Sequence, residues 1–268
     1  MSTPFPFGLI NLGGYGHMRG VTLARPKDSV RNLLPAGLEL GDQDVTPKGT
    51  HPIVLLFNDM YRAELSFPNL LPSLTYHEHF IAIPFAFLSR TALIPGYPGP
   101  YYYLVKGYLD SFFATIGGRL FWGLPKELTT LKVTASEYTV DNPCGRRLTS
   151  LAWDTRRENS FRPLAELPNF NPIRAMLSHH IVSMMPAAIG PFFVLSDFHI
   201  QWEAATLRPL KTTVEVDVAF VPGYECGRFP ASGWSPGIDQ SVLGSYELRA
   251  PWQITPIYPP MLANRART

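Results

Sequence analysis

The chain has 268 residues, of which 46% are hydrophobic and 13% aromatic, and its formal net charge is +2. Charged residues make up 16% of it, against about 25% in an average globular domain, which favours a large apolar interior, an apolar pocket or buried subunit contacts. The small net charge and the lack of a basic run exclude a dedicated nucleic-acid surface, so we expect no nucleic-acid partner.

The cellular compartment is predicted from the cysteines and from apolar runs. Cys144 and Cys226 are isolated and form neither a metal-binding spacing nor a disulfide scaffold, which favours a reducing compartment. The first residues lack a basic region followed by an apolar run, so we expect no signal peptide. No apolar stretch reaches the roughly 18 residues of a membrane-spanning helix. We therefore expect a cytoplasmic protein without a membrane segment.

Strands dominate the predicted elements. The segment from Gly13 to Gly20 is interpreted as a turn before the first strand, because it lacks the Lys-Ser/Thr and the βαβ context of a phosphate loop. Segments rich in β-branched and aromatic residues and bounded by proline, glycine or asparagine then follow as strands. They are Val21–Ala24, Ile53–Tyr61, Phe80–Leu88, Tyr101–Leu109, Phe112–Ile116, Leu128–Val140, Leu148–Thr155, Phe192–Ala205, Thr212–Val221 and Tyr246–Ile254.

Helical signals are few, because 27 prolines are spread along the chain and interrupt long helices. A short helix is predicted over Val30–Leu34. A longer one is predicted from Ile173 to about Met185, started by Asn171-Pro172. His179 and His180 would lie on different faces of that helix, so they do not converge on a ligand.

No linker, composition shift or internal repeat divides the chain. The prediction is therefore a mainly β fold, with residues 1–268 as a single domain. Its sheet is expected to be mostly antiparallel and closed, or nearly closed, into a barrel with a few short helices.

The segment from Leu74 to Phe85 carries a candidate proton shuttle. Glu78 stands between His77 and His79 at the start of a strongly apolar strand, where burial would raise the pKa of its carboxyl group. Alternation along a strand places the two histidines on one face and Glu78 on the other. Two such histidines can hold a metal, but no third ligand stands at a recognisable spacing, so no metal or cofactor is predicted.

The segment from Gly118 to Glu127 carries a candidate nucleophile. It reads Gly-Arg-Leu-Phe-Trp-Gly-Leu-Pro-Lys-Glu and sets Lys126 after a turn and a mostly apolar stretch. Burial of a lysine lowers its pKa, and the neutral amine attacks ketones and aldehydes to form a Schiff base. An exposed turn lysine is the alternative interpretation of this segment alone.

Together these segments resemble the acetoacetate decarboxylase-like superfamily. Gly118-Arg119 followed after five residues by Pro125-Lys126 has the order and spacing of its Schiff-base segment, and Tyr76-His77-Glu78 resembles its glutamate segment. Val30 to Pro35 is similar to its N-terminal helix-and-proline stretch. The resemblance implies a cone-like β-barrel, a buried apolar active site with Lys126 and Glu78, and a homo-oligomer.

The sequence departs from the family pattern at three positions. Glu127 stands where the decarboxylases have a second lysine, and a carboxylate beside Lys126 would raise its pKa unless alternation turns Glu127 away. Asn58 aligns with a second family carboxylate. The family arginine that would orient a substrate carboxylate falls at Arg19 after a shift of a few residues.

The predicted function is therefore that of a lyase acting on a carbonyl-containing or polyketide-like, largely apolar substrate. Lys126 forms the imine, Glu78 moves protons and Arg19 orients an oxygen; aldol, dehydration, cyclisation and decarboxylation steps stay open, with a role in secondary metabolism. The alternatives are a non-covalent cyclase and a non-enzymatic binder of apolar ligands. The candidate substrate-binding residues are Asn58, Tyr61, Tyr76, Phe80, Phe121, Trp122 and Glu127, and Phe57, Phe85 and Tyr102 are further candidates for the pocket wall.

Overall fold

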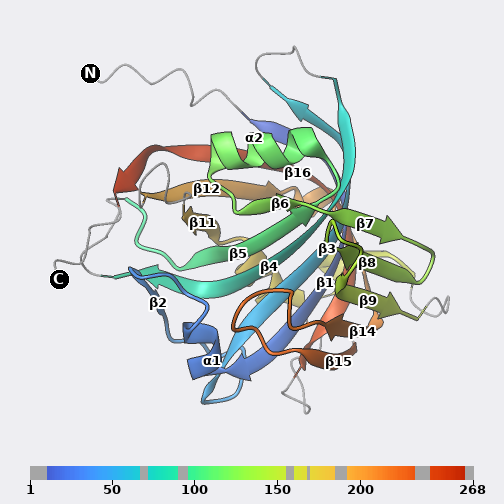
Figure 1. The fold of residues 1–268 in the computed structure, drawn as a ribbon, viewed down its shortest axis with the longest axis horizontal. Coiled ribbons are helices and arrows are strands. Elements are labelled where there is room, and N and C mark those ends of the chain that lie inside the picture. Colours follow the sequence, from blue (N-terminus) through green and yellow to red (C-terminus); the bar gives the residue numbers. More distant parts are fainter. Residues whose placement is uncertain are drawn as a thin grey trace.

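A closed ring of seven strands forms the centre of the molecule (Figure 1). The computed structural model describes residues 11–66, 72–89, 96–154, 160–167, 170–184, 192–232 and 242–262. β16 pairs back with β1 and so closes the ring, which confirms the predicted mainly β barrel. In order around the ring the strands are β1 (Leu12–Pro26), β3 (Thr50–Leu65), β4 (Leu74–Leu88), β5 (Tyr101–Leu109), β11 (His180–Met184), β12 (Phe192–Ile200) and β16 (Val242–Leu262).

Neighbouring strands of the ring are antiparallel except β5 and β11, which are parallel. Short strands extend the ring at its edges: β2 (Leu38–Leu40) pairs with β4, β6 (Lys126–Leu128) pairs with β5 in parallel, and β13 (Thr206–Pro209) joins β16 to β10 (Arg162–Pro163). The β5–β6 pairing matters for the site, because it brings the start of β6 against the barrel wall.

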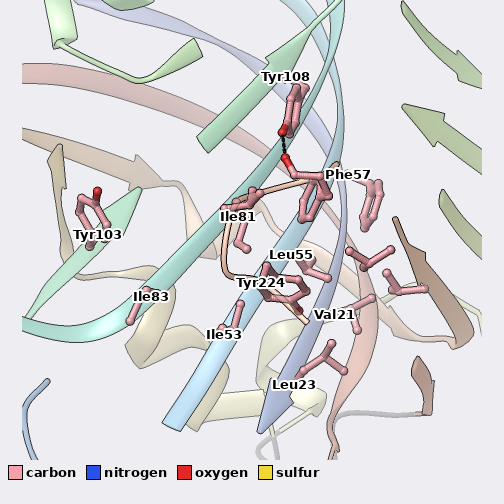
Figure 2. Packing of buried hydrophobic residues seen from close by; sticks show 14 of the residues in the cluster. Val21, Leu23, Ile53, Leu55, Phe57, Ile81, Ile83, Tyr103, Tyr108 and Tyr224 are labelled. Atoms are coloured by element: carbon pink, nitrogen blue, oxygen red, sulfur yellow. Dashed lines mark hydrogen bonds between the residues drawn. The ribbon is translucent and has the colours of Figure 1, made fainter. Parts of the chain in front are cut away.

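A second sheet covers one outer side of the barrel. Its strands are β7 (Thr130–Val133), β8 (Glu137–Asp141), β9 (Arg147–Trp153), β14 (Lys211–Val216) and β15 (Gly227–Ser232). Outward-pointing side chains of the ring, such as Val21, Leu55 and Ile81, form an apolar core with this sheet (Figure 2). Tyr108 donates its hydroxyl to the carbonyl oxygen of Phe220 within this core.

Both faces of the central strands are therefore buried. In β3, every residue from His51 to Met60 is buried, because alternate side chains point into the barrel and into the outer core. The inward-pointing set includes Met18, Leu56 and Leu248, which belong to a separate apolar cluster. Because both faces are buried, these strands carry continuous apolar stretches that do not alternate with polar residues.

Three helices appear among the described residues: α1 (Lys27–Arg31), α2 (Phe112–Trp122) and α3 (Asn171–Leu177). α2 lies over one end of the barrel and packs against β5, β6 and β12 (Figure 1). The prediction of a strand over Phe112–Ile116 is wrong, since Ser111 caps the helix by accepting the backbone N–H of Ala114. None of the helices in the described ranges has the length and apolar character needed to cross a bilayer.

Other predicted elements differ in their bounds. The turn expected from Gly13 to Gly20 is part of β1, and the strand expected over Leu128–Val140 is divided into β6, β7 and β8. The helix expected to reach Met185 ends at Leu177, so His180 begins β11. Met185 and Thr155, the predicted ends of two elements, lie outside the described residues.

Two late strands are shorter than predicted. The strand expected over Phe192–Ala205 ends at Ile200, and a 3-10 turn follows at Trp202–Ala204. The strand expected over Thr212–Val221 ends at Val216. A further 3-10 turn lies at Leu164–Glu166.

Candidate active site

A cavity of about 330 Å³ lies inside the barrel. Its wall is almost entirely apolar, with residues contributed by the ring strands and by α2. The polar lining residues that the predicted chemistry involves are Lys126, Glu78 and Asn58. All three side chains are buried. Buried apolar cavities with a few converging polar groups are typical of small-molecule sites.

The backbone turn after α2 positions Lys126. Gly123 ends the helix in the left-handed conformation, with φ 59°, which glycine adopts without steric cost. The N–H of Leu124 then donates to the carbonyl oxygen of Gly118 (3.1 Å). The Arg119 side chain donates from Nε to the carbonyl oxygen of Lys126 (2.6 Å). These bonds tie the lysine to the helix that precedes it.

Two glycines provide the space that the Lys126 side chain occupies. A Cβ on Gly118 of α2 would lie 2.5 Å from Cδ and 3.0 Å from Nζ of Lys126. A Cβ on Gly107 of β5 would lie 3.5 Å from Cγ of Lys126 and only 2.4 Å from the ring of Phe80. The lysine therefore passes between a helix and a strand that approach closely because both lack side chains there.

Glu78 is the nearest charge partner of Lys126. The Nζ of Lys126 lies 3.5 Å from Oε2 of Glu78 and 5.4 Å from the centre of the Phe80 ring. Asn58, opposite Glu78 on β3, donates its side-chain amide to Oε1 of Glu78 (3.4 Å). On the outer face, the hydroxyl oxygen of Tyr138 lies 3.2 Å from the backbone carbonyl oxygens of both Asn58 and Glu78. The hydroxyl donates a hydrogen bond to them.

Burial shifts the pKa values of both members of the pair. Burial lowers the pKa of Lys126, although the nearby Glu78 works in the opposite direction. Burial likewise raises the pKa of Glu78, against the opposing effects of Lys126 and Asn58. Both shifts favour the uncharged forms, an amine beside a carboxylic acid, because a low-dielectric site disfavours charge. Such an amine is a nucleophile at a lower pH than an exposed lysine.

Glu127 points away from the cavity. Its Oε2 lies 2.5 Å from Nζ of Lys106, and both side chains are partly exposed on the outside of the barrel. Alternation along β6 explains this direction, since Lys126 points inward. The prediction that Glu127 binds substrate is therefore not supported, and its carboxylate is paired with Lys106 and not with Lys126.

Arg19 also lies outside the cavity. Its neighbour Met18 points inward, so Arg19 points toward the second sheet, where its guanidinium lies 4.5 Å from the Trp153 ring centre. There it forms ion pairs with Asp59 (3.0 Å) and Glu247 (3.5 Å). The structure does not support a substrate-orienting role for Arg19, because its side chain lies on the face of β1 opposite the cavity.

The remaining predicted residues divide in the same way. Tyr61 is 39% exposed and is not part of the cavity wall, Phe57 stacks on His79 in the outer core, and Phe85 does not line the cavity either. The predicted residues that do line it are Asn58, Tyr76, Phe80, Tyr102, Phe121 and Trp122.

Several lining residues were not predicted. Tyr246, Leu248, Trp252 and Ile254 line the cavity at alternate positions of β16, within a strand that the sequence does indicate. The period-two alternation of the sequence places these residues on one face of the strand and could have identified them. His179, between α3 and β11, lines the cavity as well, and burial lowers its pKa to about 4.

The two histidines beside Glu78 point to the outer face, as alternation predicts. His77 lies 2.7 Å from Asp110 through Nδ1, and His79 contacts the carbonyl oxygen of Leu56 (2.9 Å) deep in the outer core. Among the described residues, no three His, Cys, Asp or Glu side chains come together as a metal-binding group.

Comparison with known proteins assigns the family. A family model for acetoacetate decarboxylase (ADC) matches residues 17–180, more than half of the chain. The chain belongs to the acetoacetate decarboxylase family. The matched range contains both Glu78 and Lys126, as well as all of α2. A search of curated proteins finds no match.

Solved structures of acetoacetate decarboxylase-like proteins share this fold at low identity. The enduracididine biosynthesis enzyme MppR with pyruvate has a TM-score of 0.58 and 13% identity, over 95% of this chain and 90% of its own. An acetoacetate decarboxylase from Legionella pneumophila has a TM-score of 0.57 and 12% identity, over 98% of this chain and 92% of its own. An acetoacetate decarboxylase-like enzyme from Sphingomonas wittichii RW1 has a TM-score of 0.55 and 14% identity, over 96% of this chain and 97% of its own. At these identities the likeness concerns the fold.

Proposed function

We propose that this acetoacetate decarboxylase family member is an imine-forming lyase for carbonyl compounds, with Lys126 as nucleophile and Glu78 as proton shuttle. The observation that carries the proposal is the buried pair itself, with Nζ of Lys126 3.5 Å from Oε2 of Glu78 in an apolar cavity. Burial lowers the pKa of Lys126, and a desolvated lysine is one of the established ways to make an amine nucleophilic.

The proposed first step forms a carbon–nitrogen bond. The Lys126 amine attacks the carbonyl carbon, and the carbinolamine then loses its hydroxyl as water. Glu78, whose pKa is raised by burial, in its acid form supplies the proton that the leaving hydroxyl needs and becomes a carboxylate beside the iminium. The iminium then accepts the electron pair released when a bond at the neighbouring carbon breaks, and Glu78 takes or returns the proton there.

The charge of the cavity wall favours neutral substrates. Lys126 and Glu78 are the charged-type side chains among the described lining residues, while Arg19 is paired elsewhere. Burying a substrate carboxylate without a partner is costly. We therefore infer an aldol, dehydration or cyclisation step in preference to decarboxylation. MppR has been solved with the condensation product of pyruvate and imidazole 4-carboxaldehyde, so this fold holds condensation products in that protein.

Reductive trapping tests the lysine. The protein is incubated with an apolar methyl ketone or aldehyde, reduced with borohydride and weighed intact, and peptide mapping locates the adduct. We expect one adduct at Lys126, lost in Lys126→Met. Lys106, which lies on the outer face beside Glu127, is the matched control: Lys106→Met should keep the adduct. An adduct spread over surface lysines, or none, would contradict the imine proposal.

The non-covalent alternative rests on the same apolar cavity. A polyene or polyketide could be folded by its walls alone, either for cyclisation or for binding without chemistry. In that case Lys126→Met and Glu78→Gln would leave turnover or binding unchanged, while Leu104→Trp on the cavity wall would abolish it.

A homo-oligomer is proposed as well. Phe112, Phe113 and Leu120 of α2 are 59%, 64% and 62% exposed, an apolar surface that subunit contacts would cover. Light scattering coupled to size-exclusion chromatography measures the subunit number. The role in secondary metabolism, the cytoplasmic location and the single-domain organisation stay predictions.

A further inference from the structure

The cavity contains polar atoms in addition to those of the Lys126–Glu78 pair. Within the described part of the chain, five further lining side chains carry a buried nitrogen or oxygen without a hydrogen-bond partner. These atoms are the hydroxyls of Tyr102 and Tyr246, Nε1 of Trp122 and Trp252, and Nδ1 of His179. Leaving such a group unsatisfied costs about 1–3 kcal/mol. Several of them around one cavity point to a ligand or to water that bonds them.

Tyr102 and Tyr246 form a pair among these groups. They come from β5 and β16, and both side chains are buried in the inner cluster. They are near enough that ionisation of Tyr246 would raise the pKa of Tyr102. Burial raises the pKa of both phenols, so both remain neutral and each can donate and accept a hydrogen bond.

The barrel wall is shaped around Tyr246. A Cβ on Gly20, its cross-strand neighbour on β1, would lie 2.1 Å from Cζ and 2.3 Å from the hydroxyl oxygen of Tyr246. The edge of the ring meets Phe170 at a centroid distance of 5.0 Å. A glycine on one side and an aromatic ring on the other therefore hold this phenol in place.

The backbone of Tyr102 is separated from that of Lys126 along β5. Tyr102 lies five residues before Gly107 on β5, and Gly107 pairs with Lys126. At about 3.3 Å per residue this is about 16 Å along the strand. Leu104, between them, lines the cavity with an apolar side chain. A ligand that reaches both places is elongated, apolar in the middle and polar at both ends.

We propose that Tyr102 and Tyr246 form an oxygen-binding subsite for a hydroxyl or carbonyl group at the far end of an elongated apolar substrate. The inference rests on the proposed function, in which the other end carries the carbonyl that reacts with Lys126. Neutral phenols bond a neutral oxygen and leave a carboxylate without a counter-charge. The substrate class is thus a long carbonyl compound with a remote hydroxyl or second carbonyl.

Matched ligands test this subsite. Two series of 2-alkanones of graded chain length, one ending in a methyl and one in a hydroxyl group, are titrated by calorimetry against the wild type and Lys126→Met. We expect the hydroxyl series to bind about tenfold tighter, or about 1.4 kcal/mol, at one chain length. Tyr102→Phe and Tyr246→Phe should each remove that preference, because they delete one oxygen and keep the ring.

Tyr103→Phe is the matched control, since Tyr103 is the sequence neighbour of Tyr102 and points into the outer core (Figure 2). It should keep the preference. Equal binding of both series at every length, or a preference that survives both cavity Phe variants, would overturn the subsite and leave the phenols bonded to water only. The two ligand series are also titrated against Lys126→Met, which cannot form the imine. If Lys126→Met keeps the preference for the hydroxyl series and borohydride trapping of the wild type fails, the subsite is upheld and the imine is rejected.

Discussion

Gly118 of α2 lies in direct contact with the side chain of Lys126, so closely that a Cβ there would be 2.5 Å from Cδ and 2.7 Å from Cε of the lysine. The helix thus provides the space for the proposed nucleophile through a missing side chain. Gly118 stands next to Gly117, and the two glycines differ sharply in this respect, since a Cβ on Gly117 would meet only the Phe121 ring at 4.0 Å.

Exchanging these glycines separates helix stability from lysine placement. Gly118→Ala should move the flexible lysine away from Glu78, and we expect imine trapping to slow by about tenfold to a hundredfold, since small displacements of reacting groups have effects of that size. Gly117→Ala should trap at the wild-type rate and raise stability by about 0.4–1 kcal/mol. Trapping rates and urea unfolding of the two variants check this; equal rates would contradict it.

The pH dependence of trapping should report the burial of Lys126. Because burial lowers its pKa below 10.5, the trapping rate should reach its plateau at a lower pH than for a surface lysine. Between the folded pKa and 10.5 the unfolded chain binds more protons at Lys126, so this residue makes the free energy of unfolding rise with pH there. Lys126→Met should remove that rise, measured by urea unfolding across the alkaline range.

The two glutamates should differ in their effect on turnover. Glu78→Gln removes the proposed proton shuttle, and we expect turnover to fall by about 10²–10⁴-fold while the protein stays folded. Glu127→Gln removes only the external pair with Lys106 and should stay within about twofold of the wild type, in line with the small effect of exposed ion pairs. Steady-state kinetics measure the turnover of both variants. A large loss of turnover in Glu127→Gln would place that residue in the mechanism.

Arg19→Met should lower stability and leave the chemistry unchanged. The guanidinium is buried between Asp59 and Glu247, and removing one partner of a buried ion pair costs about 3–5 kcal/mol. The trapped fraction of the folded protein should equal that of the wild type, because Arg19 does not line the cavity. Urea unfolding and intact mass measure the two effects, and a selective loss of trapping at full stability would restore the substrate-orienting role.

Glu247 should make the protein sensitive to acid. Its pKa is lowered to about 2 by His17, Arg19 and Arg208, in spite of burial. A lowered folded pKa contributes stability above the ordinary 4.5 that is lost as the pH falls toward 2, about 3 kcal/mol in total. Glu247→Gln should be less stable at neutral pH and show a flatter acid dependence between these values, followed by circular dichroism. An unchanged acid profile would show that other carboxylates dominate.

The barrel and the presence of Glu78 and Lys126 in one cavity follow well from the sequence, and the faces of the strands less well. The order of Glu78 and Lys126, together with the apolar segments, is enough for the fold and the pair. In β3 both faces are buried from His51 to Met60, one by the cavity and one by the second sheet. Hydrophobicity alone therefore does not show which of Phe57 and Asn58 faces the lumen. Arg19 is assigned from a family alignment that requires a shift of a few residues.

The missed helix has a different physical cause. Phe112–Ile116 is aromatic and β-branched, as strands are, and a short apolar run has no decisive period. The capping signals at Ser111 and Gly123 lie outside that run and were the better guide. Its apolar side chains face the cavity and the surface because α2 covers the end of the barrel.

The position of α2 predicts that the proposed reactivity of Lys126 depends on a local folding equilibrium. The helix has two glycines in its middle, each costing about 1 kcal/mol relative to alanine, and it exposes Phe112, Phe113 and Leu120. Whenever α2 opens, water reaches the lysine and restores its ordinary basicity, since desolvation is the main cause of its lowered pKa. On the proposed mechanism, the reactivity of Lys126 should therefore follow the hydrogen-exchange protection of the α2 amides.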